Sequence, residues 1–543
     1  MRVFNRQFAI VQFAIVPVAA CAHALSIAWP FSFGLAYGQP VWWMQLLAMA
    51  LLAWQLDGAV TKKQAAWMGW LFATVMQVAT WWWLYISLHT YGGLAAPLAV
   101  IAIVGLAAFL ALYYAAACAL FVAIAPVHRA GRACVFAALW LLAELARVAL
   151  FTGFPWGQGG YAQLDGPFAD LAKVIGVHGL TFGAALLAAG VVNLALKPRW
   201  FNGVVVATCV TLVAAASFVL KADQTGATLF SKAVRTTTPG LPFTVTLLQG
   251  NIAQDQKFLP TGGLPDALKW YSEQLLAATT SLVVTPETAV PLLPHQLPEG
   301  YLDALSNRFI KLLPESSTAP PTAALIGIPL GNRQQGYTNS AIVLKPSVNN
   351  TLYQYDKHHL VPFGEFVHPL FKWYLSIVNI PLADFNSGAI SQPSLDWQGQ
   401  RIAPNICYED LFGEELAARF LDPATAPTIM LNISNIAWFG NTIAIDQHLN
   451  ISRMRAIEFE RPMVRATNTG ATAIIDHTGR VTHLLPRHTR GVLVGEVEGR
   501  DGITPYAWWA ARFGLWPWWG LIFTIILIAA CARIYWARGQ FSR

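Results

Sequence analysis

The sequence predicts a polytopic α-helical membrane domain joined to an α/β domain outside the membrane. Of its 543 residues, 55% are hydrophobic and 12% are charged, whereas a soluble domain usually carries about 25% charged residues. Gln64–Val127 contains no Asp, Glu, Lys or Arg, but Ala222–Tyr506 has the charge content of an ordinary globular domain. The latter, at about 280 residues, is long enough to bury its own core. We therefore expect a membrane domain (1–221), a soluble domain (222–506) and a final anchor (507–543).

Eight apolar runs approach the length of a membrane-spanning helix, which is about 20 residues. They are Phe8–Trp29, Val41–Leu56, Gln64–Ile86, Leu94–Ala125, Ala133–Phe151, Leu171–Leu196, Phe201–Leu220 and Leu515–Ala532. The first run also fits a cleaved signal peptide, because Val18–Cys21 resembles a lipoprotein cleavage box. The apolar runs that follow at once favour a retained span.

Basic residues between these runs predict the topology, because cytoplasmic loops are enriched in Lys and Arg. With eight spans, every basic cluster falls on one side: Arg2 and Arg6, Lys62 and Lys63, Arg129 and Arg132, Lys197 and Arg199, and Arg533, Arg538 and Arg543. The opposite loops, Ser87–Gly93 and Thr152–Asp170, lack them. We therefore expect cytoplasmic termini and a soluble domain on the outer face. On that face, Thr152–Gln163 is either part of a lipid entrance or a plain connection.

Net charge and cysteine content exclude little else. The charge of +7 does not indicate nucleic-acid binding, since the basic residues form no patch with interleaved aromatics. Cys407 is the only cysteine of the soluble domain. No disulfide can therefore form within that domain, which leaves its redox compartment open.

Short apolar runs alternate with helical stretches in the soluble domain. Strands are expected at Phe243–Gln249, Ser281–Thr285, Ala323–Pro329, Ser340–Lys345, Ile402–Ile406, Thr428–Ile433 and Ala471–Ile475. Asp266–Thr279 and Asp446–Glu460 have helical spacing. This alternation predicts an α/β domain.

Three candidate reactive residues, Glu287, Lys357 and Cys407, follow predicted strands, where open α/β sheets gather functional side chains. A thiol with a pKa of about 8.5 needs a base or a nearby cation to act as a nucleophile at neutral pH. Glu287 can take the proton, and Lys357 can lower the thiol pKa and stabilise an oxyanion. Each also has an ordinary interpretation, as a helix cap, a solvated lysine or a small core residue.

The strings around these residues resemble the nitrilase superfamily: Pro286–Glu287, Lys357–Glu365, Cys407–Glu409 and Ser434–Gly440. In fuller form they are similar to the apolipoprotein N-acyltransferases of bacterial inner membranes. Further matching strings are Gln249–Ile252, Gln447–His448, Arg453–Glu458, Arg461–Pro462 and Asn468–Gly470. The resemblance covers essentially the whole chain, and it implies seven spans, a nitrilase-like αββα sandwich domain and an eighth span.

The resemblance also implies roles for individual residues. Glu287 is expected as general base, Lys357 as oxyanion stabiliser and Cys407 as nucleophile. Their expected supporting residues, which position and balance the thiolate, are Glu365, Tyr408 and Glu409.

The implied reaction moves an acyl chain from a phospholipid, by family habit phosphatidylethanolamine, to Cys407 as a thioester. The chain then passes to the α-amino group of the diacylglyceryl-cysteine of an apolipoprotein. Both partners lie in the membrane, and neither a metal nor an organic cofactor is needed. The resemblance places the enzyme in the inner membrane with its catalytic domain on the periplasmic face.

Two positions depart from the family pattern: Ile436 stands where the family usually has Asp, and Phe258 where it usually has Trp. We expect Phe258, Trp373 and Trp438 to help position lipid. Trp373 lies in the apolar segment Leu370–Val378, which is either a lid that dips into the membrane or a buried core helix.

The remaining polar clusters have simpler interpretations. His358, His359 and His448 lack the carboxylate or cysteine spacing of a metal site, so structural histidines are expected. Ion pairs at helical spacing are expected among Arg453, Arg455, Glu458, Glu460 and Arg461.

Three classes of function remain: an acyltransferase of lipoprotein maturation, a membrane-tethered amidase acting on a small soluble amide, and a transporter or scaffold with an inert nitrilase-like domain. Transporters place charged residues inside their spans, where Glu144 and Arg147 are here nearly alone. The eight-span pattern and the resemblance favour the acyltransferase.

Overall fold

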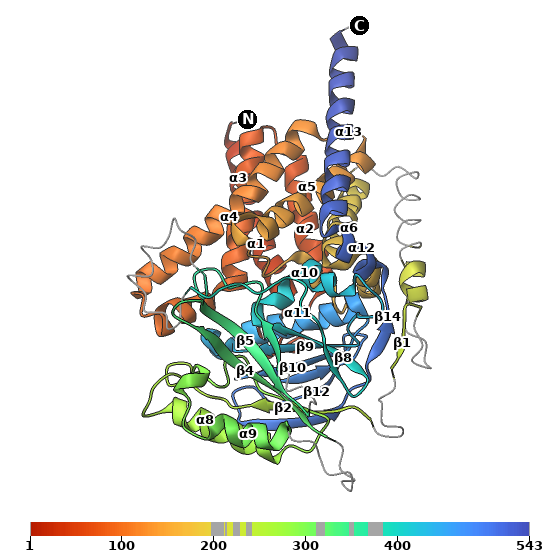
Figure 1. The fold of residues 1–543 in the computed structure, drawn as a ribbon. Helices are drawn as coiled ribbons and strands as arrows, with labels where there is room; N and C mark the ends of the chain where they lie inside the picture. The colour runs from red at the N-terminus through yellow and green to blue at the C-terminus, as the bar shows by residue number, and fades with distance from the viewer. Residues whose placement is uncertain are drawn as a thin grey trace. The chain divides into compact units, whose positions relative to one another are not determined.

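The chain forms two compact units in a computed structural model (Figure 1). It describes residues 2–126, 128–196, 211, 214–220, 229–234, 242–310, 321–346, 352–366 and 384–541. The first unit comprises Met1–Leu84, Ala96–Lys221 and Phe513–Arg543, and the second comprises Tyr85–Ala95 and Ala222–Arg512. The segment Tyr85–Ala95, which contains the expected loop Ser87–Gly93, thus belongs to the unit that carries Cys407.

The first unit is helical. Its long helices are α1 (Arg2–Ile27), α2 (Trp42–Asp57), α3 (Lys62–Trp81), α4 (Ala96–Ile124), α5 (Arg129–Ala149), α6 (Ala172–Leu196) and α13 (Trp516–Phe541). They overlap seven of the eight expected apolar runs; the other, Phe201–Leu220, lies mostly outside the described residues. Among the described helices, four segments are long and apolar enough to cross a membrane: Ala96–Ile124, Arg129–Thr152, Ala169–Leu196 and Trp516–Tyr535. The count of eight spans stays a prediction.

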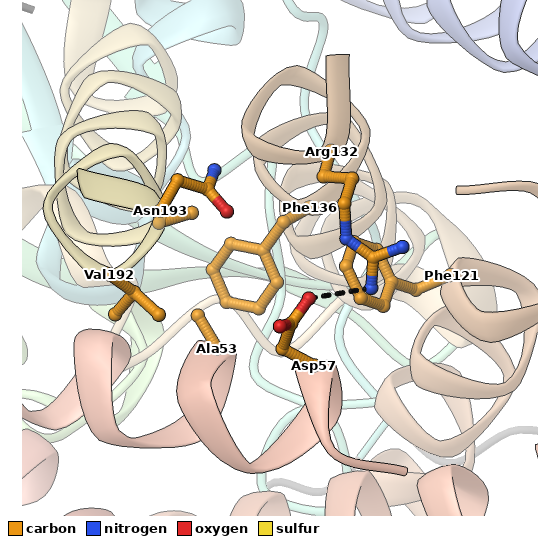
Figure 2. A pocket seen from close by; sticks show the side chains of 8 residues that line it. Ala53, Asp57, Phe121, Arg132, Phe136, Val192 and Asn193 are labelled. Atoms are coloured by element: carbon orange, nitrogen blue, oxygen red, sulfur yellow. Dashed lines mark ion pairs between the residues drawn. The ribbon is translucent and has the colours of Figure 1, made fainter. Parts of the chain in front are cut away.

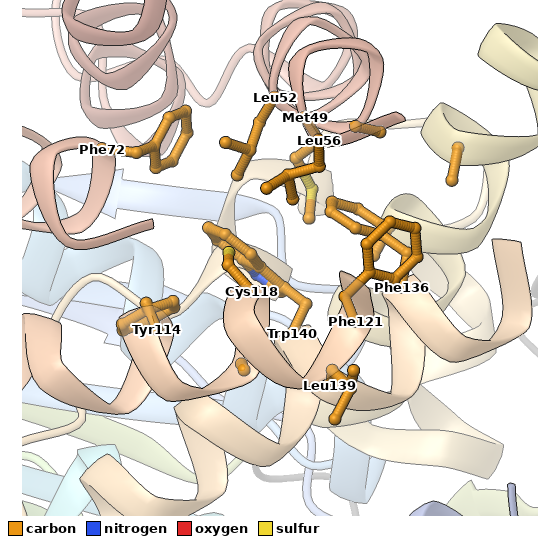
Figure 3. Close-up of a cluster of buried hydrophobic side chains, with 14 of the residues drawn as sticks. Met49, Leu52, Leu56, Phe72, Tyr114, Cys118, Phe121, Phe136, Leu139 and Trp140 are labelled. Atoms are coloured by element: carbon orange, nitrogen blue, oxygen red, sulfur yellow. The ribbon is translucent and has the colours of Figure 1, made fainter. Parts of the chain in front are cut away.

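Large side chains fill the core of this unit (Figure 3). Trp140 of α5 makes edge-on ring contacts with Phe72 of α3 and Tyr114 of α4, at centroid distances of 5.6 and 4.9 Å. Helices α3 and α4 approach closely at Gly69, where an added Cβ would lie 2.7 Å from the main-chain oxygen of Tyr114. A small residue there permits the close helix packing typical of membrane interiors.

An ion cluster joins the carboxyl end of α2 to α5. Asp57 binds Arg129 at 2.6 Å and Arg132 at 2.8 Å, and Figure 2 shows the second pair beside Phe121 and Asn193. The void there measures about 10 Å³, which is room for about one water molecule. This pocket is too small for a lipid group.

The glycine-rich loop after α5 is hydrogen-bonded inside the first unit. Oε1 of Glu144 accepts from the Gly159 amide at 3.0 Å, and Oε2 accepts from the Thr181 hydroxyl at 3.0 Å. The same hydroxyl accepts from the Gly160 amide at 2.8 Å, and Gln45 donates to the Gly159 oxygen at 2.7 Å. The buried carboxylate of Glu144 therefore fixes this loop.

The second unit contains two six-stranded sheets and a two-stranded ladder. The first sheet has the order β13-β2-β3-β4-β5-β6 and the second the order β12-β11-β10-β9-β8-β7. The strands of the first sheet are β2 (Thr244–Gln249), β3 (Leu282–Val284), β4 (Ala323–Asn332), β5 (Gly336–Leu344), β6 (Tyr353–Asp356) and β13 (Gly491–Glu496). Those of the second are β7 (Leu395–Trp397), β8 (Gln400–Ile406), β9 (Ile429–Ser434), β10 (Met463–Thr467), β11 (Ala473–Ile475) and β12 (Val481–Leu484). Strands β1 (Ser231–Ala233) and β14 (Arg500–Gly502) form the ladder.

The two sheets pack face to face, with helices on their outer faces (Figure 1). Leu247 of β2 and Ile433 of β9 lie in the core between the sheets. Leu248 and Met430 point the other way, into the helical layers, because successive strand residues face opposite sides. The helices are α8 (Gly263–Ala277) and α9 (Tyr301–Phe309) on one side and α10 (Gly413–Ala417), α11 (Ala444–Phe459) and α12 (Pro505–Phe513) on the other. The layers are those of an αββα sandwich.

The packing of α3 against α4 predicts different effects for two helical glycines. Gly69→Ala should lower the free energy of unfolding by about 1–3 kcal/mol, because the new methyl group meets main-chain atoms that cannot yield. Gly105→Ala in α4 is the matched control, since a Cβ there meets nothing within 4 Å. Thermal unfolding in detergent measures both. Equal melting temperatures for the two variants would contradict the tight α3–α4 contact.

Candidate active site

Glu287, Lys357 and Cys407 lie at the carboxyl ends of strands of the sandwich. Glu287 is just beyond β3 and Lys357 directly follows β6, both in the first sheet; Cys407 directly follows β8 of the second. The Lys357 Nζ lies 3.2 Å from Oε1 of Glu287, and both charges act on the Cys407 thiol. The structure thus brings the three predicted residues together.

Glu287 is a buried carboxylate held by hydrogen bonds on both oxygens. Oε1 accepts from Nδ2 of Asn339 at 2.8 Å and from Lys357 at 3.2 Å, and Oε2 accepts from the Asn435 amide at 2.8 Å. Burial acts to raise the pKa of Glu287, but the Lys357 charge and these hydrogen bonds outweigh it and hold the pKa below its usual value. Glu287 is therefore ionised at neutral pH, as a general base must be.

Lys357 lies between two carboxylates. Its Nζ is 2.9 Å from Oε1 and 2.8 Å from Oε2 of Glu365, in addition to its contact with Glu287. Nδ2 of Asn339 bridges the same two acids, at 2.7 Å from Oε1 of Glu365. Burial disfavours the ammonium, but the two acids raise the pKa of Lys357 above its ordinary value. Lys357 is thus permanently charged, and Glu365 helps to fix it.

Cys407 starts a tight turn and is half-buried. Its φ of 54° lies in the left-handed region, which costs a non-glycine residue about 1–3 kcal/mol and often marks a functional site. Burial and the nearby Glu287 raise the pKa of the thiol to about 12, against the effects of Lys357 and the Ser434 hydroxyl. The resting cysteine is therefore a neutral thiol.

His448 of α11 holds the main-chain oxygen of Cys407. Arg465 lies 3.1 Å from Nδ1 of His448, and because a guanidinium only donates, Nδ1 is the acceptor. The proton is then on Nε2, which donates to the Cys407 oxygen at 3.1 Å. Burial and Arg465 hold the pKa of His448 well below its ordinary value, and Arg465 pairs with buried Asp410 at 3.3 Å. This chain supports the strained turn.

Glu409 ties the Cys407 turn to the loop after Lys357. Its oxygens accept from the Ile406 amide at 2.5 Å, the His358 amide at 2.7 Å and the Tyr355 hydroxyl at 2.8 Å. Burial raises the pKa of Glu409 despite these donors. The carboxylate thus joins the two sheets at the site.

Tyr408 is buried and packs by its ring against Phe412 and His359, at centroid distances of 5.4 and 5.7 Å. His359 also stacks on Phe412 and lies 3.0 Å from Glu415. Nδ1 of His358 lies 2.7 Å from the Gly388 oxygen. Within the described ranges, no group of three His, Cys, Asp or Glu side chains could hold a metal ion.

Of the three residues expected to position lipid, the structure describes Phe258 and Trp438 but not Trp373. Phe258 is half-buried, in the loop between β2 and α8. Trp438 is also half-buried and meets Tyr91 of the Tyr85–Ala95 segment edge-on, at 6.0 Å between ring centroids. Trp373 and the segment Leu370–Val378 lie outside the described residues.

Sequence reasoning missed the site roles of Asn339, Lys257 and the hydrogen-bonded His448. Asn339 precedes the predicted strand Ser340–Lys345, where a polar residue is ordinary. Lys257 is 3% exposed, and its Nζ donates to the Glu287 main-chain oxygen at 3.2 Å. The sequence motifs near Lys257 were the string Gln249–Ile252 and the neighbouring residue Phe258, and neither pointed to the lysine itself.

The predicted helical ion pairs form in part. Arg455 and Glu458 of α11 pair at 2.9 Å, with both side chains fully buried. Arg461, which follows the helix, instead donates to main-chain oxygens, among them that of Pro427 at 2.6 Å.

Comparison with known proteins decides the family. A family model described as apolipoprotein N-acyltransferase N-terminal domain matches residues 12–190, and a carbon-nitrogen hydrolase model matches residues 244–502. The apolipoprotein N-acyltransferase of Verminephrobacter eiseniae (strain EF01-2) is 55% identical over 517 residues, which are 92% of each chain. The chain belongs to the apolipoprotein N-acyltransferase family. The namesake from Ralstonia nicotianae is 42% identical over 498 residues, or 91% of this chain and 89% of that protein.

These matches confirm the resemblance predicted from the motifs. The chain is a membrane acyltransferase of lipoprotein N-acylation, with a nitrilase-like carbon-nitrogen hydrolase domain. Among solved structures, a mutant of the amidase from Nesterenkonia sp. AN1 is 17% identical with a TM-score of 0.35, covering 52% of this chain and 98% of the amidase.

Glu409→Ala should lower the free energy of unfolding of this protein by about 3 kcal/mol or more. Each buried donor that is left without its acceptor costs about 1–3 kcal/mol. The donors are the Ile406 and His358 amides and the Tyr355 hydroxyl. Thermal unfolding in detergent tests this, with exposed Glu496→Ala of β13 as the control. If both variants melt at the wild-type temperature, Glu409 does not hold the site together.

Proposed function

We propose that this enzyme moves an acyl chain from a phospholipid, through a thioester on Cys407, to the α-amino group of the diacylglyceryl-cysteine of an apolipoprotein. The main observation in support of this proposal is the buried Glu287–Lys357 pair beside the thiol of Cys407, the single cysteine of the second unit. Membership of the family supplies the substrate classes. Phosphatidylethanolamine is the proposed donor.

In the first step the Cys407 sulfur attacks the ester carbonyl carbon, and the thiol proton passes to Glu287. The negative charge that develops on the carbonyl oxygen is stabilised by the Lys357 ammonium. The ester C–O bond then breaks, and Glu287 returns the proton to the leaving oxygen. The products are a lysophospholipid and the acyl thioester.

In the second step the acceptor amine attacks the thioester carbonyl carbon. Glu287 takes a proton from the attacking nitrogen, and the C–S bond breaks. The sulfur regains the proton, so the enzyme returns to its neutral thiol with an amide formed on the acceptor. In each half-reaction Glu287 therefore accepts one proton as a base and returns it as an acid.

Glu365, Tyr408 and Glu409 have supporting roles in this proposal. Glu365 keeps Lys357 charged and in place, and Glu409 fixes the two segments that carry Lys357 and Cys407. Tyr408 packs behind the nucleophile turn. Phe258 and Trp438 lie in the segments that carry Lys257 and Asn435, and we assign them contacts with lipid.

The same residues, with a small soluble amide as acyl donor and water as acceptor, would make the enzyme an amidase that releases ammonia. The apolar helices and the match to the N-terminal domain of the acyltransferases favour two membrane-bound substrates instead. We propose eight spans in the bacterial inner membrane, with cytoplasmic termini and a periplasmic catalytic unit. The distribution of Lys and Arg between the apolar runs supports this topology.

Mass spectrometry of the purified enzyme with phosphatidylethanolamine alone should detect one acyl adduct on Cys407. The adduct should be absent from Cys407→Ala, present in the control Cys531→Ala, and discharged by a diacylated lipopeptide. Cys531 is exposed on α13 of the other unit and has no part in the proposed reaction. Ammonia release from small amides without any acyl adduct would support the amidase instead.

A further inference from the structure

A second buried lysine lies at the site, on the loop between β2 and α8. Lys257 is 3% exposed, and its Nζ donates to the main-chain oxygen of Glu287 at 3.2 Å. The loop is fixed to the second sheet, because Asn468 bonds both main-chain groups of Ile252 at 2.8–2.9 Å and Asn435 donates to Gln254 at 2.8 Å. The position of Lys257 is thus built into the fold.

The charge of Lys357 is already matched. It contacts both Glu287 and Glu365, so this trio carries a net charge of −1. When the thiol proton moves to Glu287, that residue becomes neutral. The charged groups are then Glu365, the thiolate and Lys357, and their net charge is again −1. In the low-dielectric interior an excess negative charge close to a thiolate strongly disfavours its formation.

Lys257 has the opposite character. Its hydrogen bond goes to a neutral carbonyl oxygen, and in the part of the chain that the structure describes no carboxylate forms an ion pair with it. Its charge interacts with both Glu287 and Cys407. The net charge of Glu287, Glu365, Lys357, Lys257 and the Cys407 thiol is zero before and after the proton transfer.

We propose that Lys257 is a positioning residue of the reaction: its ammonium supplies the positive charge that balances the Cys407 thiolate while Lys357 stays bound to Glu287 and Glu365. In this step the S–H bond breaks, the proton passes to a Glu287 oxygen, and the electron pair stays on sulfur. No other reactant is required. The inference rests on the proposed nucleophilic role of Cys407.

The acid–base properties of the two groups support this coupling. Burial lowers the pKa of Lys257 to about 8, although Glu287 and Cys407 oppose it, so most of the side chain is charged at neutral pH. Burial and Glu287 raise the pKa of Cys407 to about 12, so the thiol needs a nearby cation. The charged groups around Cys407 are Glu287, Glu365, Lys357, Lys257 and Arg465, together with Glu409 and Asp410 of its own turn. Asp410 is paired with Arg465, and neutral His448 lies on the main-chain oxygen of Cys407.

The rate of iodoacetamide alkylation of Cys407, followed by peptide mass spectrometry between pH 6 and 10 on the full-length enzyme in detergent, tests the proposal. Lys257→Met should lower the rate at neutral pH about tenfold, which is the effect of one pKa unit. The difference from the wild type should shrink as the pH rises above about 8, where Lys257 loses its own charge. Lys257→Gln keeps a donor for the Glu287 oxygen without the charge, and should lose as much. Lys257→Arg should restore most of the rate.

The control is Lys269→Met, which removes an exposed lysine of α8 and should leave the profile unchanged. Thermal unfolding shows whether each variant is folded; should Lys257→Met fail to fold, Lys257→Gln alone decides. Wild-type profiles for folded Lys257→Gln would overturn the proposal, because a purely structural lysine does not shift the pH dependence. Alkylation needs no lipid, so its outcome is independent of whether phospholipid is the acyl donor.

Discussion

The buried cluster of Glu287, Lys357 and Glu365 is the interaction on which the rest of the site depends. Removing three charged groups from water is unfavourable unless contacts and hydrogen bonds compensate for the lost hydration. Here Asn339 donates to both acids through one nitrogen, and its main-chain oxygen accepts from the Lys357 amide at 2.8 Å. The Asn435 amide completes the shell of Glu287. Loss of one member would leave the others as uncompensated buried charges.

The sandwich explains how this cluster comes to lie beside Cys407, the proposed nucleophile. Glu287 and Lys357 follow strands of the first sheet, Glu365 lies in the loop after Lys357, and Cys407 follows a strand of the second sheet. The apolar core between the sheets sets their separation, and Glu409 bonds across it to segments of both. Catalytic geometry therefore depends on packing throughout the interior. Because protein interiors are close-packed, a shift of the sheets would be resisted by many side chains at once.

The sequence predicted what depends on local pattern. Apolar runs such as Ile402–Ile406 predicted strands. Glu287, Lys357 and Cys407 were candidates because they follow such strands. Contacts between distant segments left no such pattern: Lys257 and Asn339 reach Glu287 from loops and strands 30 and 52 residues away. Ser87–Gly93 was expected as a loop between two spans, yet Tyr85–Ala95, which contains it, belongs to the unit that carries Cys407, where Tyr91 contacts Trp438.

In the resting site Cys407 is a neutral thiol beside an ionised Glu287, and not a thiolate paired with a cation. The pKa of Cys407 is raised and that of Glu287 is lowered, so proton transfer between them is unfavourable until negative charge moves from sulfur onto a substrate. In the proposed mechanism, an acyl carbonyl whose oxygen is stabilised by Lys357 takes up this negative charge when the sulfur attacks it. A neutral thiol is also a poor target for adventitious oxidants and alkylating agents, because the thiolate is the reactive form. In the proposed mechanism, the electrostatics that keep Cys407 protonated would therefore restrict its reaction to acyl groups placed between Glu287 and Lys357.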